Sequence, residues 1–267
     1  MNCTVRHLRA TFRAFALGMV TVFLYGLWLS LSAFLLPFRK SSDRWRSFNF
    51  RNWAEAAAAL LGMRILVEGT RPRPPFILVS NHLSYLDVVT LASQLDCLFI
   101  AKSDVADWPF LGLLCRSMGT IFVNRDSRKD ILRVNHLIQR ALADGKGVLL
   151  FPEATSTAGL EVLPFHSALL EPAARAGYPV SYAAITYHTP AGESPASLSV
   201  CWWGDMTFLS HLYRVFQLTS FDAKVTFGAH SIRADDRKVL AKELWQAVQR
   251  EFVPSAKTEE LCKLVAH

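Results

Sequence analysis

His82 and Asp87, five residues apart, are the two side chains of this sequence best suited to acid–base chemistry. A carboxylate that accepts a hydrogen bond from one imidazole nitrogen fixes the tautomer and leaves the other nitrogen available as a general base. On an ideal helix, however, residues five apart are rotated by roughly 140°, a poor angle for contact. We therefore expect the two side chains to meet only if His82 lies in a turn before a helix and folds back.

The residues around this pair predict a strand, a turn and a helix. The apolar run 76–79 follows three prolines and is typical of a buried strand. Ser80 and Asn81 are suited to capping a helix predicted over 83–95. His82 then lies at the carboxyl end of a strand, where side chains in α/β folds reach a ligand crevice. A histidine near an aspartate is also common on protein surfaces, so this interpretation needs support from the rest of the chain.

Polar residues follow three other predicted strands, where a packed core does not require them. Lys102 follows one strand, Arg125 a second, and a segment with Glu153, Thr155 and Ser156 a third. If these strands are parallel neighbours, their carboxyl ends converge on one crevice. Such a crevice would hold a base with its acid, two cations, and a carboxylate flanked by hydroxyls. This set of groups is suited to transferring an electrophilic group to an alcohol beside an anionic head group.

Apolar runs and amphipathic segments alternate from residue 63 onward, which predicts an α/β fold. Strands are expected at 65–68, 76–79, 98–101, 120–123, 148–151, 180–186, 198–202 and 223–227, and helices at 83–95, 111–118, 130–144, 167–176 and 235–252. This alternation indicates a mixed or largely parallel central sheet covered by helices on both faces. The chain divides into N-terminal membrane-anchoring helices (1–62), one α/β domain (63–253) and a C-terminal tail (254–267).

The N-terminal segment has the composition of a membrane anchor. The run 14–38 contains no charged residue, and at about 1.5 Å per residue it can cross a hydrocarbon core of about 30 Å. Residues 1–52 hold eight basic side chains against one acidic, which accounts for the whole net charge of +7. We expect a membrane surface, not nucleic acid, as the partner. The run fits either a transmembrane helix or a re-entrant or monotopic helix. A second helix is predicted at 44–62, and it is either interfacial or part of the core.

Other chemistries lack their signatures. The five cysteines are odd in number and include no C-x-x-C pair, which argues against a disulfide framework or a zinc site. The sequence has no G-x-S-x-G elbow, no H-E-x-x-H helix and no glycine-rich phosphate loop. We expect no metal and no nucleotide cofactor. Ser84 is better explained as a helix cap than as a nucleophile.

The polar segments resemble the motifs of the glycerolipid acyltransferases, the family typified by 1-acylglycerol-3-phosphate acyltransferase. Residues 81–87, N-H-L-S-Y-L-D, are similar to its N-H-x-x-x-x-D motif, and residues 151–157, F-P-E-A-T-S-T, to its F-P-E-G-T-R-S motif. Residues 119–125 and 178–185 resemble its second and fourth motifs, and Lys102 lies in its lysine-bearing segment. The motifs occur in the family's order within residues 63–230.

The resemblance implies a membrane-bound O-acyltransferase of phospholipid biosynthesis, with its acyltransferase domain at 63–253. In it, His82 takes the proton from a lysolipid hydroxyl, which attacks the thioester of an acyl-CoA or an acyl-carrier protein, while Asp87 orients the histidine. A backbone N–H near the Glu153 turn stabilises the oxyanion. The acyl donor is a substrate, so no cofactor is expected. The implied location is a bacterial inner membrane, with the catalytic domain on the cytoplasmic side.

The resemblance also assigns the substrate-binding residues, which are Lys102, Arg125, Glu153, Thr155 and Ser156. The two cations bind acceptor phosphate, with ion pairs to nearby aspartates as the alternative, and the glutamate binds the acceptor or holds its loop. Two residues depart from the family: Ala154 replaces a glycine, which limits the backbone, and Ser156 replaces an arginine that would pair with a phosphomonoester. The first expected acceptor is 1-acyl-sn-glycerol-3-phosphate, and lyso-ornithine lipid or another lysolipid is the alternative. A lipid-binding protein without turnover and a thioesterase are the rival functions.

Overall fold

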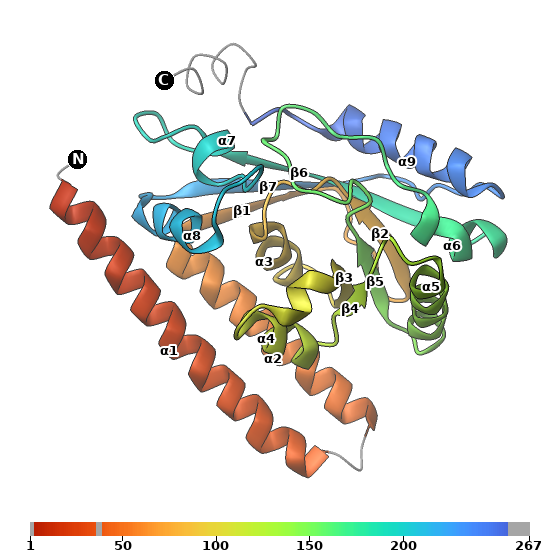
Figure 1. Ribbon diagram of the computed structural model, residues 1–267, viewed down its shortest axis with the longest axis horizontal. Helices are drawn as coiled ribbons and strands as arrows, with labels where there is room; N and C mark the ends of the chain where they lie inside the picture. The colour runs from red at the N-terminus through yellow and green to blue at the C-terminus, as the bar shows by residue number, and fades with distance from the viewer. Residues whose placement is uncertain (1–2, 36–38, 256–267) are drawn as a thin grey trace.

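The computed structural model describes residues 3–35 and 39–255, which form an α/β unit with two long helices packed against one side (Figure 1). The two helices, α1 (Cys3–Leu35) and α2 (Arg39–Leu61), lie side by side. The apolar run expected at 14–38 falls in α1 up to residue 35, and its last three residues lie outside the described part of the chain. The expected tail at 254–267 likewise lies outside it from residue 256 onward.

The described residues form one seven-stranded sheet in the order β1-β7-β6-β2-β5-β3-β4. Neighbouring strands are parallel except β6 and β7, which are antiparallel, so the prediction of a mixed sheet is confirmed. The strands are β1 (Met63–Glu68), β2 (Phe76–Ser80), β3 (Cys97–Lys102), β4 (Ile121–Val123), β5 (Gly147–Leu150), β6 (Val180–His188) and β7 (Phe221–Phe227).

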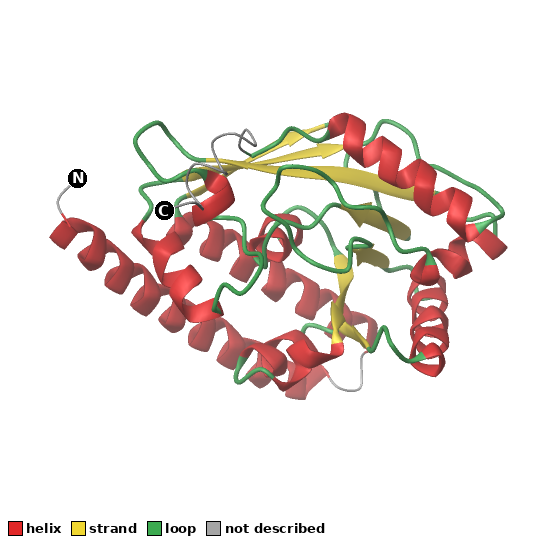
Figure 2. Ribbon diagram, turned by 45° about the horizontal axis from the view of Figure 1, so that its top comes forward, coloured by secondary structure: helices red, strands yellow, loops and turns green. Residues whose placement is uncertain are grey.

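Helices cover both faces of the sheet, as the sequence predicted (Figures 1 and 2). One face packs against α2, α3 and α8, and the other against α5, α6 and α9. The remaining helices are α3 (Leu86–Ala92), η1 (Ser103–Asp107), α4 (Leu111–Ser117), α5 (Arg128–Ala143), η2 (Ala168–Leu170), α6 (Glu171–Arg175), α7 (Ala196–Ser199), α8 (Phe208–Gln217) and α9 (Arg237–Glu251).

The two central strands that position the candidate site are buried on both faces. All residues of β2 and β5 are buried, which is why both appear in the sequence as continuous apolar runs. Along β2, Leu78 joins the core under α2 and α3, whereas Ile77 joins the core under α5 and α9. In the parallel pairing of β2 with β5, Val79 lies opposite Leu150. The residues that follow these strands, including His82 and Phe151, therefore lie at the same edge of the sheet.

One expected element was wrong, and one helix was not expected. The strand predicted at 198–202 is instead helix α7 followed by irregular chain, because a short apolar run fits a buried helix as well as a strand. Its apolar residues Val200 and Cys201 are fully buried, and Trp202 N donates to Leu83 O at 2.8 Å. Helix α8, which contacts α7, was not predicted from the sequence.

Helix α1 contacts α8 near its N-terminus and contacts α2 and α4 further along. Near its N-terminus, Arg9 Nη1 donates to Gln217 O at the end of α8 at 2.9 Å. Further along, Trp53 Nε1 donates to Thr21 Oγ1 and Tyr25 OH lies 3.0 Å from Ser117 Oγ. Within the described residues, α1 is the one helix long and apolar enough to cross a membrane, by length and composition.

The core interpretation that the sequence left open for residues 44–62 is confirmed for the second half of α2, and the interfacial interpretation stays a prediction. The second half belongs to the core, since Ala54, Ala57 and Leu61 are at most 2% exposed. The first half carries Phe48, which is 60% exposed.

Candidate active site

His82 lies in the turn between β2 and α3 and faces Asp87 in the first turn of α3. Its Nδ1 is 2.7 Å from Asp87 Oδ2. The same oxygen accepts hydrogen bonds from Leu83 N at 2.7 Å and Ser84 N at 3.1 Å, so the turn wraps around the carboxylate. The prediction that His82 folds back from a turn is confirmed. The helix predicted from residue 83 begins only at Leu86, because Asp87 already binds the two N–H groups that precede it.

The hydrogen bonds of this pair assign the tautomer of the imidazole. An ionised carboxylate can only accept, so Nδ1 carries the hydrogen and Nε2 is the basic nitrogen. The ring of His82 stacks on Phe151 with centroids 4.2 Å apart, and its side chain is 22% exposed. Asp87 is fully buried. This arrangement leaves a partly exposed imidazole whose Nδ1 is bound to a carboxylate inside the protein.

The second carboxylate oxygen of Asp87 is held from the sheet. Tyr187 OH donates to Asp87 Oδ1 at 2.8 Å, and the tyrosine is fully buried in β6. Tyr187 was not among the site residues predicted from the sequence. A signal existed, because alternation along β6 places Ala183, Ile185 and Tyr187 on the same buried face, and a buried hydroxyl needs a partner.

Asn81 fixes the start of the turn and does not cap a helix as expected. Its Oδ1 accepts from Ile185 N at 2.7 Å and its Nδ2 donates to Ile185 O at 2.9 Å. The side-chain amide thus continues the pairing of β2 with β6 one residue beyond the strand. Ser80 lies beside it, with Oγ 3.4 Å from Asn81 Oδ1. The residue at the cap position of α3 is Tyr85.

Glu153 holds two loops together and is 3% exposed. Its Oε1 accepts from His82 N at 2.6 Å and its Oε2 from Leu163 N at 2.8 Å. Of the two roles that the sequence suggested, these bonds favour the loop-holding one. Burial raises the pKa of Glu153 to about 7, although the two backbone N–H groups act in the opposite direction. The carboxyl group therefore changes its charge near neutral pH.

Arg125 reaches the same loop from the end of β4. Its Nη1 donates to Ala154 O, and burial lowers the pKa of its guanidinium. The expectation that the ends of β2, β4 and β5 converge is therefore confirmed. Ala154 has a φ of +65°, so the loop keeps a left-handed conformation despite the β-carbon, which the sequence analysis expected to limit the backbone.

Of the other expected binding residues, Thr155 and Ser156 lie in this loop, and Lys102 lies at the end of β3. Thr155 is exposed and donates to Ser156 O at 3.4 Å, and Ser156 is half-buried. The next residue ties the loop to the motif, since Thr157 N donates to His82 O at 3.0 Å. Lys102 is exposed and its ammonium pairs with Asp104. This ion pair is the alternative to phosphate binding that the sequence left open for Lys102.

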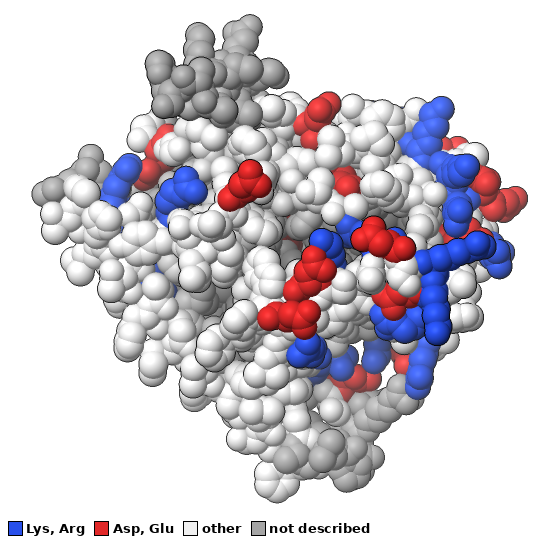
Figure 3. Space-filling model, in the orientation of Figure 1, with Lys and Arg blue, Asp and Glu red and all other residues white. Residues whose placement is uncertain are grey.

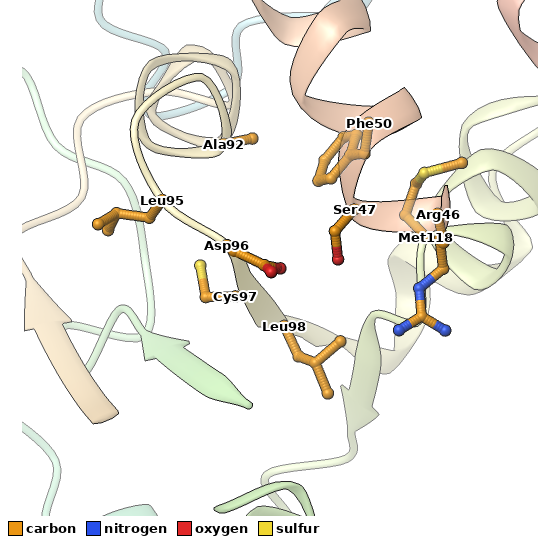
Figure 4. Close-up of a pocket in the computed structure, with 9 residues that line it drawn as sticks. All are labelled: Arg46, Ser47, Phe50, Ala92, Leu95, Asp96, Cys97, Leu98 and Met118. Carbon is orange, nitrogen blue, oxygen red and sulfur yellow. The ribbon is translucent and has the colours of Figure 1, made fainter. Parts of the chain in front are cut away.

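The small cavity shown in Figure 4 lies at the other end of the strands. It has a volume of about 10 Å³ and lies between α2, the end of α3 and the start of β3, with Phe50, Ala92 and Leu98 in its wall. A space of this size holds about one water molecule and no lipid. Among residues 3–35 and 39–255, no group of three His, Cys, Asp or Glu side chains is placed to hold a metal ion.

Comparison with known proteins supports the motif resemblance. The family model for acyltransferases matches residues 64–186. A lyso-ornithine lipid O-acyltransferase from Rhodobacter capsulatus is 34% identical over 75% of this chain and 74% of its own length. A 1-acyl-sn-glycerol-3-phosphate acyltransferase from Neisseria gonorrhoeae is 32% identical over 72% of this chain and 76% of its own length.

A solved structure shares the fold. The crystal structure of the 1-acyl-sn-glycerophosphate acyltransferase PlsC from Thermotoga maritima superposes with a TM-score of 0.65, at 19% identity, over 92% of this chain and 96% of that one. The matched domain contains the His82–Asp87 pair and most of the segments that carry the resemblance. The chain therefore belongs to the acyltransferase family represented by these relatives, and it is an acyltransferase.

Proposed function

We propose that this acyltransferase moves a fatty acyl group from an acyl-thioester to the hydroxyl of a lysolipid at a membrane surface. The observation that carries the proposal is the 2.7 Å contact between His82 Nδ1 and the buried carboxylate of Asp87. It leaves a basic Nε2 on a partly exposed ring, which is what deprotonation of an alcohol requires.

The reaction proceeds through one tetrahedral intermediate and needs no acyl-enzyme. His82 Nε2 removes the hydroxyl proton as the lysolipid oxygen bonds to the thioester carbon. The charge that develops on the former carbonyl oxygen is stabilised by a backbone N–H in the turn after Glu153. The carbon–sulfur bond then breaks, and the imidazolium returns its proton to the leaving thiolate. Asp87 stabilises the imidazolium between these two steps.

The outer face of α1 supports attachment to a membrane. Figure 3 shows few charged side chains over most of α1, whereas Lys and Arg gather over α5 and α6. Exposed phenylalanines line this helix, and Phe15 is 68% and Phe23 69% exposed. Arg9 and Arg13 turn inward and donate to the last carbonyls of α8. Because α1 is bound to α8, α2 and α4, we favour a helix that lies in the membrane surface over one that crosses it.

The acceptor we favour is lyso-ornithine lipid, with 1-acyl-sn-glycerol-3-phosphate as the second candidate. Both names occur among the relatives at similar identity. The observation that favours the first is the loss of cations suited to a phosphomonoester. Ser156 stands where the family resemblance expects an arginine, and Lys102 is paired with Asp104. A bidentate arginine is the strongest common partner of a phosphate, so its absence reduces the advantage of a phosphorylated acceptor.

An acceptor panel tests this function. The purified full chain is supplied with one labelled acyl-CoA or acyl-carrier protein and, in parallel, with 1-acyl-sn-glycerol-3-phosphate, other lysophospholipids or lyso-ornithine lipid. We expect acceptor-dependent formation of the diacyl product. His82→Ala should abolish it, whereas His136→Ala, an exposed histidine on α5, should not.

The same assay separates the rival functions. Free fatty acid as the sole product, unchanged by any acceptor, would identify a thioesterase. Binding of lysolipid without turnover would identify a lipid-binding protein. Native-rate transfer by the His82→Ala variant would refute the proposed mechanism.

A further inference from the structure

Within the described part of the chain, Tyr187 is the one side chain outside the motif turn that forms a hydrogen bond with the buried carboxylate of Asp87. We propose that Tyr187 is a positioning residue of the catalytic pair, which holds Asp87 from the sheet so that the carboxylate presents its other oxygen to His82. The proposal rests on the proposed function, and it adds a residue that the motifs do not contain.

The donors around the carboxylate are divided between two elements. Oδ2 accepts hydrogen bonds from His82 Nδ1 and from the N–H groups of Leu83 and Ser84, which all belong to the turn. On Oδ1, the hydroxyl of Tyr187 comes from β6, an element of the central sheet. Without that donor, the carboxylate would be fixed only by the same turn that carries the base. Tyr187 therefore ties the orientation of the acid to the rigid sheet.

The direction of the hydrogen bond follows from the neighbours of the hydroxyl. Thr90 Oγ1 lies 3.3 Å from Tyr187 OH, but it donates its own hydrogen to Leu86 O at 3.0 Å. The hydrogen of the tyrosine is therefore available to Asp87. Burial raises the pKa of Tyr187 well above its usual range, so the phenol stays a donor throughout the working range of the enzyme.

The ring by itself does not explain a tyrosine at this position. Tyr187 packs in the same apolar core as Ile185 and Phe221, where a phenylalanine would fill the same space. A buried hydroxyl is unfavourable in such a core unless it is hydrogen-bonded. The partner that this hydroxyl reaches is the orienting acid of the base, which points to a role in catalysis.

Removal of the hydroxyl should change the proton affinity of the pair. A donor to Asp87 stabilises the form of the pair that has lost its proton, so its loss favours protonation whichever of the two residues takes the proton. The acid side of the pH–rate profile should then move upward by about one pH unit, a tenfold change in proton affinity. The other titratable groups facing the pair are Glu153 from the loop after β5 and the buried thiol of Cys201 after α7.

The test compares Tyr187→Phe with Tyr178→Phe in the full-length protein. Tyr178 is also a tyrosine with a bonded hydroxyl, which donates to Pro75 O away from the pair. In Tyr187→Phe we expect a ten- to hundredfold lower kcat, a KM within about twofold, and the upward shift of the profile, while Tyr178→Phe behaves as the native enzyme. Because Glu153 titrates near neutral pH, the comparison is repeated in a Glu153→Gln background.

Two further measurements keep the result independent of folding and of turnover. Incorporation of 3-fluorotyrosine at position 187 keeps the shape but makes a stronger donor, so the profile should move to lower pH. Titration of histidine 13Cε1 resonances, with His82 assigned by the His82→Ala variant, should show the same two shifts without any substrate.

The outcomes separate this proposal from the proposed function. An unshifted His82 titration and pH profile in both position-187 variants would overturn the role of Tyr187, even if native transfer were normal. No transfer by the native chain with any acceptor would overturn the proposed function, and the resonance titration would still decide whether Tyr187 controls the pair.

Discussion

Replacement of Asp87 by asparagine tests how the buried carboxylate supports the base. When His82 takes a proton, a positive charge forms on a ring whose Nδ1 is 2.7 Å from the Asp87 oxygen. With about 4 Å between the charge centres and an effective dielectric constant of about 20, their attraction is about 4 kcal/mol. Asparagine keeps the shape and loses most of this attraction, so we expect kcat to fall by about 10²- to 10³-fold.

The same substitution should also lower stability, because an amide has one oxygen. Asp87 now accepts from three groups on Oδ2 and from Tyr187 on Oδ1. Asparagine must leave at least one of these buried donors without an acceptor, at a cost of about 1–3 kcal/mol. Thermal unfolding of the native and Asp87→Asn proteins is therefore measured alongside kcat. The value of kcat is compared at a temperature where both proteins are folded.

The assay is release of the thiol from an acyl-CoA in the presence of lysolipid. Asp236→Asn is the matched control, since Asp236 also accepts from two backbone N–H groups, at the start of α9, and asparagine is an equally good cap there. We expect the control to keep native kcat. A folded Asp87→Asn protein with kcat within about threefold of the native value would refute the assigned role of the carboxylate.

Four further changes test the site and its surroundings. The pKa of Glu153 is raised from 4.5 to about 7, so the folded state binds its proton more tightly; stability from this group is present below pH 4.5 and lost as pH rises to about 7. Between pH 5 and pH 8, the free energy of unfolding of the native protein should fall by about 2–3 kcal/mol because of this group, and urea unfolding should show that Glu153→Gln removes that fall. Ala154→Gly should raise stability by about 0.5–1 kcal/mol, seen as a Tm higher by about 2 °C, because glycine tolerates a left-handed conformation. Ser156→Arg should raise kcat/KM for 1-acyl-sn-glycerol-3-phosphate relative to lyso-ornithine lipid by about tenfold, the effect of one charge-assisted hydrogen bond. Phe12→Ser with Phe15→Ser should weaken co-sedimentation with lipid vesicles, because both rings are exposed on α1.

Each of these changes has a result that contradicts its reasoning. Equal pH dependence of stability in the native and Glu153→Gln proteins would mean that this carboxyl group does not titrate as its burial implies. A lower Tm for Ala154→Gly would show that the β-carbon stabilises the loop. Unchanged acceptor preference in Ser156→Arg would separate this position from the head group. Unchanged vesicle binding of the double α1 variant, with Leu132→Ser on α5 as the exposed apolar control, would remove α1 from the membrane contact.

Most elements of the sheet could be predicted because their signals are local. The runs that became β2 and β5 are apolar throughout, since helices cover both faces of these strands. Helix α5 shows the regular spacing of apolar residues that packs Val134 and Ile138 into the core. The strand predicted at 198–202 was wrong because Val200 and Cys201 are buried by contacts with distant parts of the chain. Four apolar residues interrupted by Ser199 fit either type of element.

The site was only partly predictable for the same reason. The spacing of His82 and Asp87, together with the strand before them, required a turn that brings the ring back to the carboxylate, and this geometry was found. The partners from other elements were not visible: Tyr187 lies one hundred residues from Asp87, and Leu163 ten residues from Glu153. Likewise, the choice of Lys102 between phosphate and Asp104 depends on side-chain packing at the surface.

The sequence by itself determined the candidate chemistry, most of the strands and helices around it, and the apolar N-terminal helix, because residue types, periodicity and spacing are properties of neighbouring residues. Tertiary structure decided which groups hold His82 and Asp87, since a buried carboxylate takes its donors from whichever elements the sheet brings together. It also decided that α1 lies against the domain, with Arg9 and Arg13 bound to the carbonyl end of α8. Those contacts join residues more than two hundred positions apart, and no local pattern encodes them.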